Sequence, residues 1–426
     1  MSAPSTQSTD PGAREMSKAL ALAVILGVLG AMAASIFLAV EGALTTFFWD
    51  YLPGLFGATS APWWWVPIML LLGAALIVAS WRLGPGMGSP LDGFHFDVGP
   101  SRALAALSAA LATLVFGAVL GPEAPLIVCG TVIGGFIARK QPAQAQAFAM
   151  ALGGIAAIGL ILGNPFIPAF MVLEFAAMGA LPRAALIPLF VALASGYFVQ
   201  IGLGPFSGIG TSELSVPGLP PVEKIEAGLI VGAMVVALAA GLCVLIARHI
   251  GYSVQSIAKK HPTASILAAA LTISAVAVAI MLAFDQPPQA VLFSGQSEIP
   301  LLLTETSSTA VLAIVLAKAL TYGISLGSGF RGGPIFPAVA IGVGCGALAA
   351  LLVPSLGLSA MIVPAMAAAV AAMLKLPFTG ALLAVLIAGS AGALATPLAI
   401  LAAVIGVALR MAYDKVSGNQ VPAPRM

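Results

Sequence analysis

Charge is what this sequence lacks most. Only 8% of its 426 residues are Asp, Glu, Lys or Arg, whereas soluble domains average about a quarter. Apolar residues make up 60% of the chain, and the mean hydropathy is +1.10. Because so few polar side chains could not cover a folded chain in water, we predict an integral membrane protein. A net charge of +2 is too small to indicate a nucleic-acid partner.

Cysteine and histidine are also scarce. The cysteines lie in apolar stretches and the histidines in polar ones, without the spacing of a disulfide framework or a metal site. We therefore predict no metal site and no cofactor, and we expect the histidines at the surface. The apolar segments hold no group of nucleophile, base and metal ligands, so a transporter is expected rather than an enzyme. The residues concerned are Cys129, Cys243, Cys345, His95, His249 and His261.

Apolar runs fill most of the chain. A helix needs about 20 apolar residues to cross a bilayer, and several runs are shorter or broken at Gly or Pro. Irregular backbone at membrane depth requires burial in protein or a wet cavity. The fold class predicted is an all-α membrane protein of tilted and broken helices around a pathway. The runs lie near residues 18–40, 62–80, 103–120, 125–138, 145–163, 167–180, 185–202, 227–246, 264–284, 308–325, 334–353, 360–374 and 379–411.

The ends of the chain are polar. We expect residues 1–16 to be disordered, 17–413 to form the transmembrane domain, and 414–426 to be a short tail without a regulatory domain. Basic residues near the helix ends favour a cytoplasmic location for both termini of a multi-pass plasma-membrane protein. These residues are Arg14, Lys18, Arg139, Lys140, Arg248, Lys259, Lys260 and Lys415.

Two proline-rich loops indicate an internal repeat. Residues 121–125 read GPEAP and residues 333–337 read GPIFP, 212 positions apart (333 minus 121). Later features keep the same offset: Gly130 and Gly134 with Gly342 and Gly346, and Pro165-Phe166 with Pro377-Phe378. Repeated halves with broken helices are typical of transporters, with the binding site where the halves meet. We predict halves at about 17–205 and 223–413.

Glu123 is the acidic residue of the first loop. Pro125 favours the start of a helix, and a helix start attracts anions through its free N–H groups and dipole. A carboxylate at membrane depth costs at least about 2.5–3.5 kcal/mol. Glu123 could therefore occupy an anion site when charged and leave it when protonated. The alternative is a carboxylate that only caps its own helix, and the second loop favours the functional interpretation.

Two glycine-rich loops could bring backbone N–H groups close to an ion. Residues 327–337 read GSGFRGGPIFP, and residues 84–90 read GPGMGSP, in which Ser89 offers a hydroxyl. The alternative is close packing of helices through small residues, which is common in membranes.

These motifs resemble those of the CLC chloride channels and transporters between about Gly84 and Leu383. GPEAP is similar to the family signature G-K/R-E-G-P, GSGFRGGPIFP to its glycine-rich run ending G-G-x-F-x-P, and GMGSP to G-S-G-I-P. The resemblance implies a homodimer with two inverted halves per subunit, one anion pathway in each, and Glu123 as the external gating glutamate. It places anion contacts at Gly86, Met87, Gly88, Ser89, Gly121, Ala124, Gly333, Ile335 and Phe336.

The chain departs from the family pattern at the ion site. Met87 falls on the family's anion-coordinating serine. Pro334 and Ile335 occupy positions whose N–H groups usually face the ion, and proline has no N–H to donate. Phe175 falls on the internal proton-transfer position, with Glu174 as its neighbour. The site is therefore expected to differ from that of chloride-selective members.

The cargo predicted is a halide. Chloride is the family default, whereas Met87, the missing internal glutamate and the altered glycine-rich run resemble the fluoride-exporting branch, which would make the chain a fluoride/proton antiporter. An unrelated secondary transporter is a further alternative. The family's late tyrosine has no clear match, since Tyr413 lies at the end of the last run. Passive flow and proton exchange both stay open, because Glu123 alone could carry protons.

Four other charged residues in or near the apolar runs have two interpretations each. Glu41 is expected at an interface or hydrogen-bonded, rather than in the pathway. Glu174 is either a buried structural carboxylate or part of a proton path. Lys318 could pair with a carboxylate or set a positive field for anions. Arg331 could add positive potential near the second loop or anchor the chain at the interface.

Overall fold

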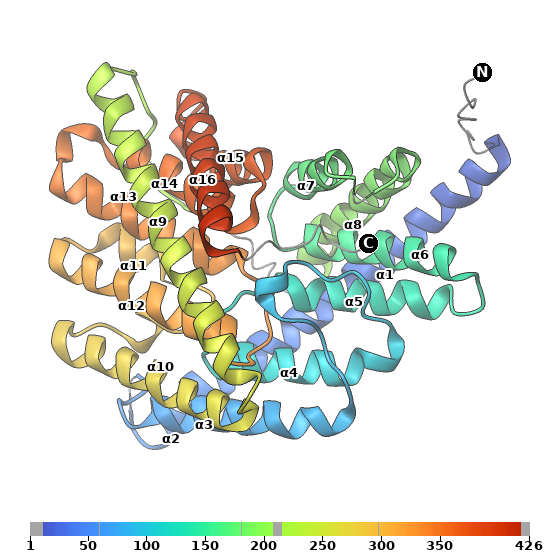
Figure 1. The fold of residues 1–426 in the computed structure, drawn as a ribbon, viewed down its shortest axis with the longest axis horizontal. Coiled ribbons are helices and arrows are strands. Elements are labelled where there is room, and N and C mark those ends of the chain that lie inside the picture. Colours follow the sequence, from blue (N-terminus) through green and yellow to red (C-terminus); the bar gives the residue numbers. More distant parts are fainter. Residues whose placement is uncertain (1–11, 59, 180, 208–214, 297, 419–426) are drawn as a thin grey trace.

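The computed structural model describes residues 12–58, 60–179, 181–207, 215–296 and 298–418 (Figure 1). Helices make up nearly all of this part of the chain, and it contains no β-strand beyond one isolated bridge between Gly121 and Gly333. The α-helices are α1 (Ala13–Thr46), α2 (Leu52–Leu55), α3 (Trp65–Ser80), α4 (Ala103–Val115), α5 (Glu123–Ile137), α6 (Ala143–Gly159), α7 (Phe166–Ala177), α8 (Leu186–Ser207), α9 (Ala227–Ala258), α10 (Pro262–Phe284), α11 (Ile299–Thr304), α12 (Ser308–Gly327), α13 (Ile335–Leu352), α14 (Leu358–Leu374), α15 (Pro377–Ile387) and α16 (Ala395–Ser417).

Within the described residues, seven helical stretches are long and apolar enough to cross a membrane, and shorter apolar helical stretches of 10–17 residues lie among them. This mixture of long and short helices confirms the all-α membrane fold. Their exposed faces carry large apolar side chains, as a lipid environment requires.

Two details of the sequence prediction are wrong, and one predicted apolar run divides into two helices. Helix α1 begins at Ala13, so residues 13–16 are helical rather than disordered. The run at 379–411 is two helices, α15 and α16, because the backbone turns at Gly392 with a φ of 82°. Helix α16 extends to Ser417 and includes the first residues of the predicted tail. Residues 1–11 and 419–426 of the predicted tails lie outside the described residues.

Helix packing repeats along the chain. Helix α1 packs on α6 and α8, and α9 packs on α14 and α16 in the same way. The pairs α5–α6 and α13–α14 correspond likewise, and α3 packs against α10 of the other group. Figure 1 shows α9 to α16 gathered on one side of the molecule and α4 to α8 on the other. The boundaries of the halves, 17–205 and 223–413, stay a prediction.

Glycines at matching positions let these helix pairs approach closely. A Cβ added to Gly130 would lie 2.0 Å from the carbonyl oxygen of Gly153, so α5 and α6 touch through their backbones. A Cβ on Gly342 would lie 2.6 Å from the Cα of Met366 on α14. Small residues serve this purpose in membranes because packing, rather than the hydrophobic effect, holds the helices together. The helices that begin at the two proline-rich loops are therefore firmly positioned.

A buried ion pair fixes the segment between α10 and α12. Lys318 on α12 pairs with Glu298, and both side chains are almost wholly buried. The Lys318 ammonium also donates to the carbonyls of Leu292 (2.9 Å) and Phe293 (3.2 Å). The N–H of Phe293 in turn donates to Gly117 (3.2 Å), just before the GPEAP loop. Of the two interpretations of Lys318, pairing with a carboxylate is the one seen.

Candidate functional site

The two proline-rich loops meet face to face. The N–H of Gly121 donates to the carbonyl of Gly333 (2.8 Å), and the N–H of Gly333 donates to that of Gly121 (2.5 Å). Each loop leads into a helix, with Pro122 preceding α5 and Pro334 preceding α13. Residues 212 positions apart thus form one small structure that joins the starts of two helices.

Glu123 lies across this junction and is fully buried. Its Oε1 accepts the N–H of Phe336 in the first turn of α13 (2.7 Å), whereas its Oε2 is buried and has no hydrogen-bond partner among the described residues. Helix starts attract negative charge. Glu123 therefore places its carboxylate at the start of α13, and a role confined to capping its own helix does not account for this contact.

The two bridging glycines make room for the Glu123 carboxylate. A Cβ on Gly333 would lie 1.8 Å from its Oε2, and a Cβ on Gly121 would lie 2.1 Å from the same atom. Real Cβ atoms do not come this close to another heavy atom, so any larger residue would displace the carboxylate.

Three side chains that sequence reasoning missed hold the backbone of these loops. The Tyr322 hydroxyl donates to the carbonyl of Pro334 (2.8 Å), and Ser325 accepts the N–H of Val119 (3.1 Å). Thr113 accepts the N–H of Arg331 (2.9 Å). Two of them could have been found from the sequence, because a tyrosine and a serine stand inside the apolar run of α12. A buried hydroxyl normally has a hydrogen-bond partner, so these side chains predict polar contacts there.

The loop at residues 84–90 lies beside the junction with its polar groups engaged elsewhere. Met87 packs in a small apolar cluster to which Ala124 is adjacent. The Gly88 carbonyl accepts from Arg331 (3.1 Å), and the Ser89 hydroxyl accepts from Gln255 (3.0 Å). Among the described residues no hydrogen bond joins this loop to Glu123. A methionine side chain, rather than a hydroxyl, thus faces the neighbourhood of Ala124.

Some of the other residues predicted to contact the anion lie against Glu123, and one lies away from it. Gly121, Gly333 and Phe336 touch the Glu123 carboxylate directly, and Ile335 begins the helix between them. Gly86 instead packs near Ala105 on α4. Of the predicted anion contacts, those around Glu123 are therefore brought together, and Gly86 lies apart from them.

Glu174, on α7, caps the start of helix α15. Its carboxylate accepts the N–H groups of Phe378 (2.8 Å) and Thr379 (2.9 Å) and the Thr379 hydroxyl, at the start of α15. Phe175, next to it, is buried. All three hydrogen bonds favour a charged carboxylate held in place, which supports a structural role over a proton path.

Replacing Glu174 with glutamine is expected to destabilise the protein by about 1–3 kcal/mol. Both carboxylate oxygens accept hydrogen bonds, and in the variant one of them becomes an NH₂ group that cannot accept. Any proton flux through the remaining folded protein should be unchanged. Thermal unfolding in detergent and proton flux in proteoliposomes measure the two effects. A normal melting temperature with lost proton flux would instead make Glu174 a proton carrier.

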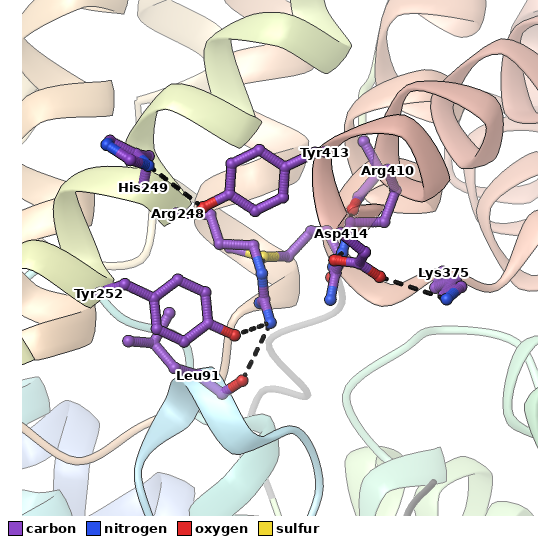
Figure 2. A network of polar contacts seen from close by, with 10 residues as sticks. Leu91, Arg248, His249, Tyr252, Lys375, Arg410, Tyr413 and Asp414 are labelled. Atoms are coloured by element: carbon purple, nitrogen blue, oxygen red, sulfur yellow. Dashed lines mark hydrogen bonds and ion pairs between the residues drawn. The ribbon is translucent and has the colours of Figure 1, made fainter. Parts of the chain in front are cut away.

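Two cavities extend to the junction of the proline-rich loops, one at Pro122 and the other at Pro334. One, of about 490 Å³, touches Pro122 and is lined by Glu41 and Asp50 among others. The other, of about 90 Å³, touches Pro334 and is lined by three basic side chains, Arg248, Lys375 and Arg410, and by Asp92 and Asp414. Figure 2 shows the polar network around the second cavity. The carboxylate of Glu123 lies between the loops that these cavities reach.

The remaining sequence expectations have mixed outcomes. Glu41 accepts the Thr45 hydroxyl (3.2 Å), as a hydrogen-bonded carboxylate should. Arg331 points to the Gly88 carbonyl, near the second loop. His249 and His261 are exposed, and the His95 side chain is 28% exposed with its Nε2 buried. Tyr413 lies 3.4 Å from His249, at the end of α16.

A multi-pass helical membrane protein in which two helix starts converge on one buried carboxylate belongs to the class of ion transporters. Comparison with known proteins names the family: residues 85–410 match the family model described as "Voltage gated chloride channel". Since the match spans most of the chain, the protein belongs to this family, the CLC family, and performs CLC-type anion transport.

Individual relatives agree with the family. The chain is 27% identical over 349 residues to the "Putative ion-transport protein YfeO" of Escherichia fergusonii and 26% identical to that of Escherichia coli, with 79% of this chain and 80% of each relative covered. A slow cyanobacterial Cl⁻/H⁺ antiporter has the same fold, with a TM-score of 0.76 and 16% identity over 95% of this chain and 96% of the other. A CLC-type fluoride/proton antiporter matches with a TM-score of 0.71 and 17% identity over 94% and 97%.

Proposed function

We propose that this protein exchanges halide ions for protons, with Glu123 as both gate and proton carrier and chloride as the first candidate cargo. One observation carries the proposal: the Glu123 carboxylate accepts the Phe336 N–H at the start of α13 while its second oxygen is buried without a partner. The same N–H cannot serve a halide and the carboxylate together. The Glu123 carboxylate and a halide therefore cannot bind the Phe336 N–H at the same time.

Protonation supplies the opening step. A charged Glu123 is attracted by the Phe336 N–H and by the dipole of α13. When a proton binds the carboxylate, this attraction falls, and the hydrogen bond loses the extra strength of a charged acceptor. The neutral side chain then leaves, and a halide takes the N–H that it vacated. The return of Glu123 expels the halide and releases the proton.

Fluoride is the second candidate cargo, and the loop at residues 84–90 favours it. Met87 is buried where the resemblance places a serine, and the neighbouring Ser89 hydroxyl is engaged by Gln255. Ser89 is the acceptor in that bond and keeps its own O–H to donate, so the difference from the chloride pattern lies at Met87.

Halide efflux from proteoliposomes tests the proposal. Chloride and fluoride efflux are recorded with internal pH for the wild type and for Glu123→Gln, which keeps the shape of the side chain but cannot carry a proton. We expect efflux of the preferred halide to drive protons the opposite way in the wild type, and the proton movement to vanish in the variant.

Other outcomes are equally informative. Halide efflux without proton movement in the wild type would make the protein a channel. Proton movement that survives in Glu123→Gln would place the carrier elsewhere. The larger of the two efflux rates names the cargo.

A further inference from the structure

Two hydroxyl groups join the repeated parts of the chain in a reciprocal way. The Thr113 hydroxyl on α4 accepts the N–H of Arg331 in the second loop (2.9 Å). The Ser325 hydroxyl on α12 accepts the N–H of Val119 before the first loop (3.1 Å). The two contacts are related by the offset of the repeat, because 325 minus 113 and 331 minus 119 are both 212. The loops therefore have matching supports here, as they do at the glycine bridge.

Tyr322 departs from this correspondence. Its hydroxyl donates to the carbonyl of Pro334 (2.8 Å), whereas the residue 212 positions earlier is Ala110, which has no side-chain donor. The matching carbonyl of the first loop, that of Pro122, accepts the N–H of Leu126 (3.0 Å). Within the described residues, the carbonyl before α13 is thus held by another helix, and the carbonyl before α5 is held by its own.

This contact is made at the end of α13 that receives Glu123. Pro334 precedes the first turn of α13, and the N–H of Phe336 in that turn donates to the Glu123 carboxylate (2.7 Å). Tyr322 has no exposed surface, and it lies near enough to Glu123 for an electrostatic interaction. Because a buried donor and acceptor are costly to separate, the hydroxyl fixes the Pro334 carbonyl. The placement of the Phe336 N–H therefore depends on Tyr322.

We propose that Tyr322 is a positioning residue, which holds the start of α13 so that the Phe336 N–H meets the Glu123 carboxylate. Without the hydroxyl, the Pro334 carbonyl is released and the first turn of α13 can shift. The Phe336 N–H then binds a negative group less tightly, and Glu123 leaves the helix start more easily. The inference rests on the proposed function for its part in transport, but the position of the N–H can be tested without transport.

A purely structural Tyr322 is the competing explanation. A hydrogen bond between buried groups stabilises the fold wherever it lies, so a lower melting temperature in Tyr322→Phe fits both roles. Only the positioning role changes the proton affinity of Glu123, because a hydrogen bond to a charged carboxylate favours its charged form. The protonation of Glu123 is therefore the property that separates the two explanations.

The charges around Glu123 stay the same in this comparison. Helices α4, α6 and α13 contain no Asp, Glu, Lys or Arg. Tyr322→Phe removes a neutral hydroxyl, so a change in the titration of Glu123 reports the lost hydrogen bond rather than a lost charge. The charged side chains of the other elements around the junction are Lys318 of α12, which pairs with Glu298, Arg331 of the second loop, and Glu41 of α1, which lines the cavity at Pro122.

Infrared titration of the full chain in detergent is the test. The carboxyl band of Glu123 is identified by its absence in Glu123→Gln, and the protonated and charged forms absorb at different frequencies. We expect the pH at which Glu123 is half-protonated to be higher in Tyr322→Phe by roughly half a unit to one unit, the shift that corresponds to one hydrogen bond. Tyr51→Phe, which removes the hydroxyl of an exposed tyrosine, should titrate like the wild type.

The outcomes distinguish this inference from the proposed exchange. A Tyr322→Phe variant in which Glu123 titrates as in the wild type overturns the positioning role, even if its melting temperature falls. A wild type that moves neither chloride nor fluoride overturns the exchange, while the titration still decides the role of Tyr322. If Tyr322→Phe does not fold, 3-fluorotyrosine in place of Tyr322 provides a stronger donor. Half-protonation of Glu123 should then move to lower pH, and an unchanged value would again contradict the role.

Discussion

Replacing Gly333 with alanine is expected to force Glu123 off the start of α13 and leave the gate open. The three atoms nearest to the added Cβ all belong to Glu123: Oε2 at 1.8 Å, Cδ at 2.6 Å and Cβ at 2.9 Å. The backbone cannot easily move aside, because both hydrogen bonds of the bridge to Gly121 hold it. The flexible carboxylate must therefore move, and it loses the Phe336 N–H.

The size of this effect follows from the bond that is lost. A hydrogen bond to a charged group contributes about 1.5–3 kcal/mol, so the open state should gain roughly 10- to 150-fold in population. We expect halide efflux that is faster and less dependent on pH than in the wild type. Efflux from proteoliposomes at two pH values measures both properties.

Two further variants make the result specific to Glu123. Gly228→Ala on α9 adds the same methyl group where nothing lies within 4 Å, and it should behave like the wild type. In a Glu123→Ala background, Gly333→Ala should change efflux much less, because the displaced carboxylate is already absent and only the 2.9 Å contact with the Cβ of residue 123 remains. If Gly333→Ala keeps the wild-type pH dependence, the carboxylate does not close the site at Gly333.

Replacing Lys318 with methionine should produce the largest loss of stability. The change leaves Glu298 buried without its cation, and it removes the donor to the carbonyls of Leu292 and Phe293. Breaking a buried ion pair by removing one partner typically costs about 3–5 kcal/mol. Thermal unfolding in detergent should therefore show a clear fall in melting temperature, and the yield of folded protein should drop.

The double variant Lys318→Met with Glu298→Gln tests whether the pair itself causes the loss. Removing both charges leaves no uncompensated ion, so the double variant should be more stable than Lys318→Met alone. Transport by the double variant should resemble the wild type, since neither residue touches the Glu123 carboxylate. Losses that simply add would show that the two side chains stabilise the protein independently.

Local patterns explain what the sequence could predict. The apolar runs, the repeated proline-rich loops and Glu123 are visible because each depends on residues close together in the chain. The helices α5 and α13 begin within two residues of the prolines that indicated them. The apolar run at 379–411 contains the turn at Gly392, which its mean hydropathy does not reveal.

Contacts between distant segments explain what the sequence could not predict. Glu123 was expected at a helix start, but its acceptance of the Phe336 N–H depends on how two loops 212 residues apart meet. Arg248 belongs to the basic residues that the sequence places at helix ends. Composition cannot show that this arginine is buried, or that nearby Asp414 pairs with Lys375 and Arg410. Glu298 was overlooked because its partner Lys318 lies on the next long helix.

The bridge between Gly121 and Gly333 has an evolutionary consequence. The two glycines of the bridge make the same pair of hydrogen bonds, each donating to and accepting from the other. The residue two positions further on, however, is Glu123 in one loop and Ile335 in the other. If both copies carried a carboxylate, two like charges would compete for one buried junction, and if neither did, nothing would close it. A duplicated ancestor with identical loops would have had to become dissimilar at this one position.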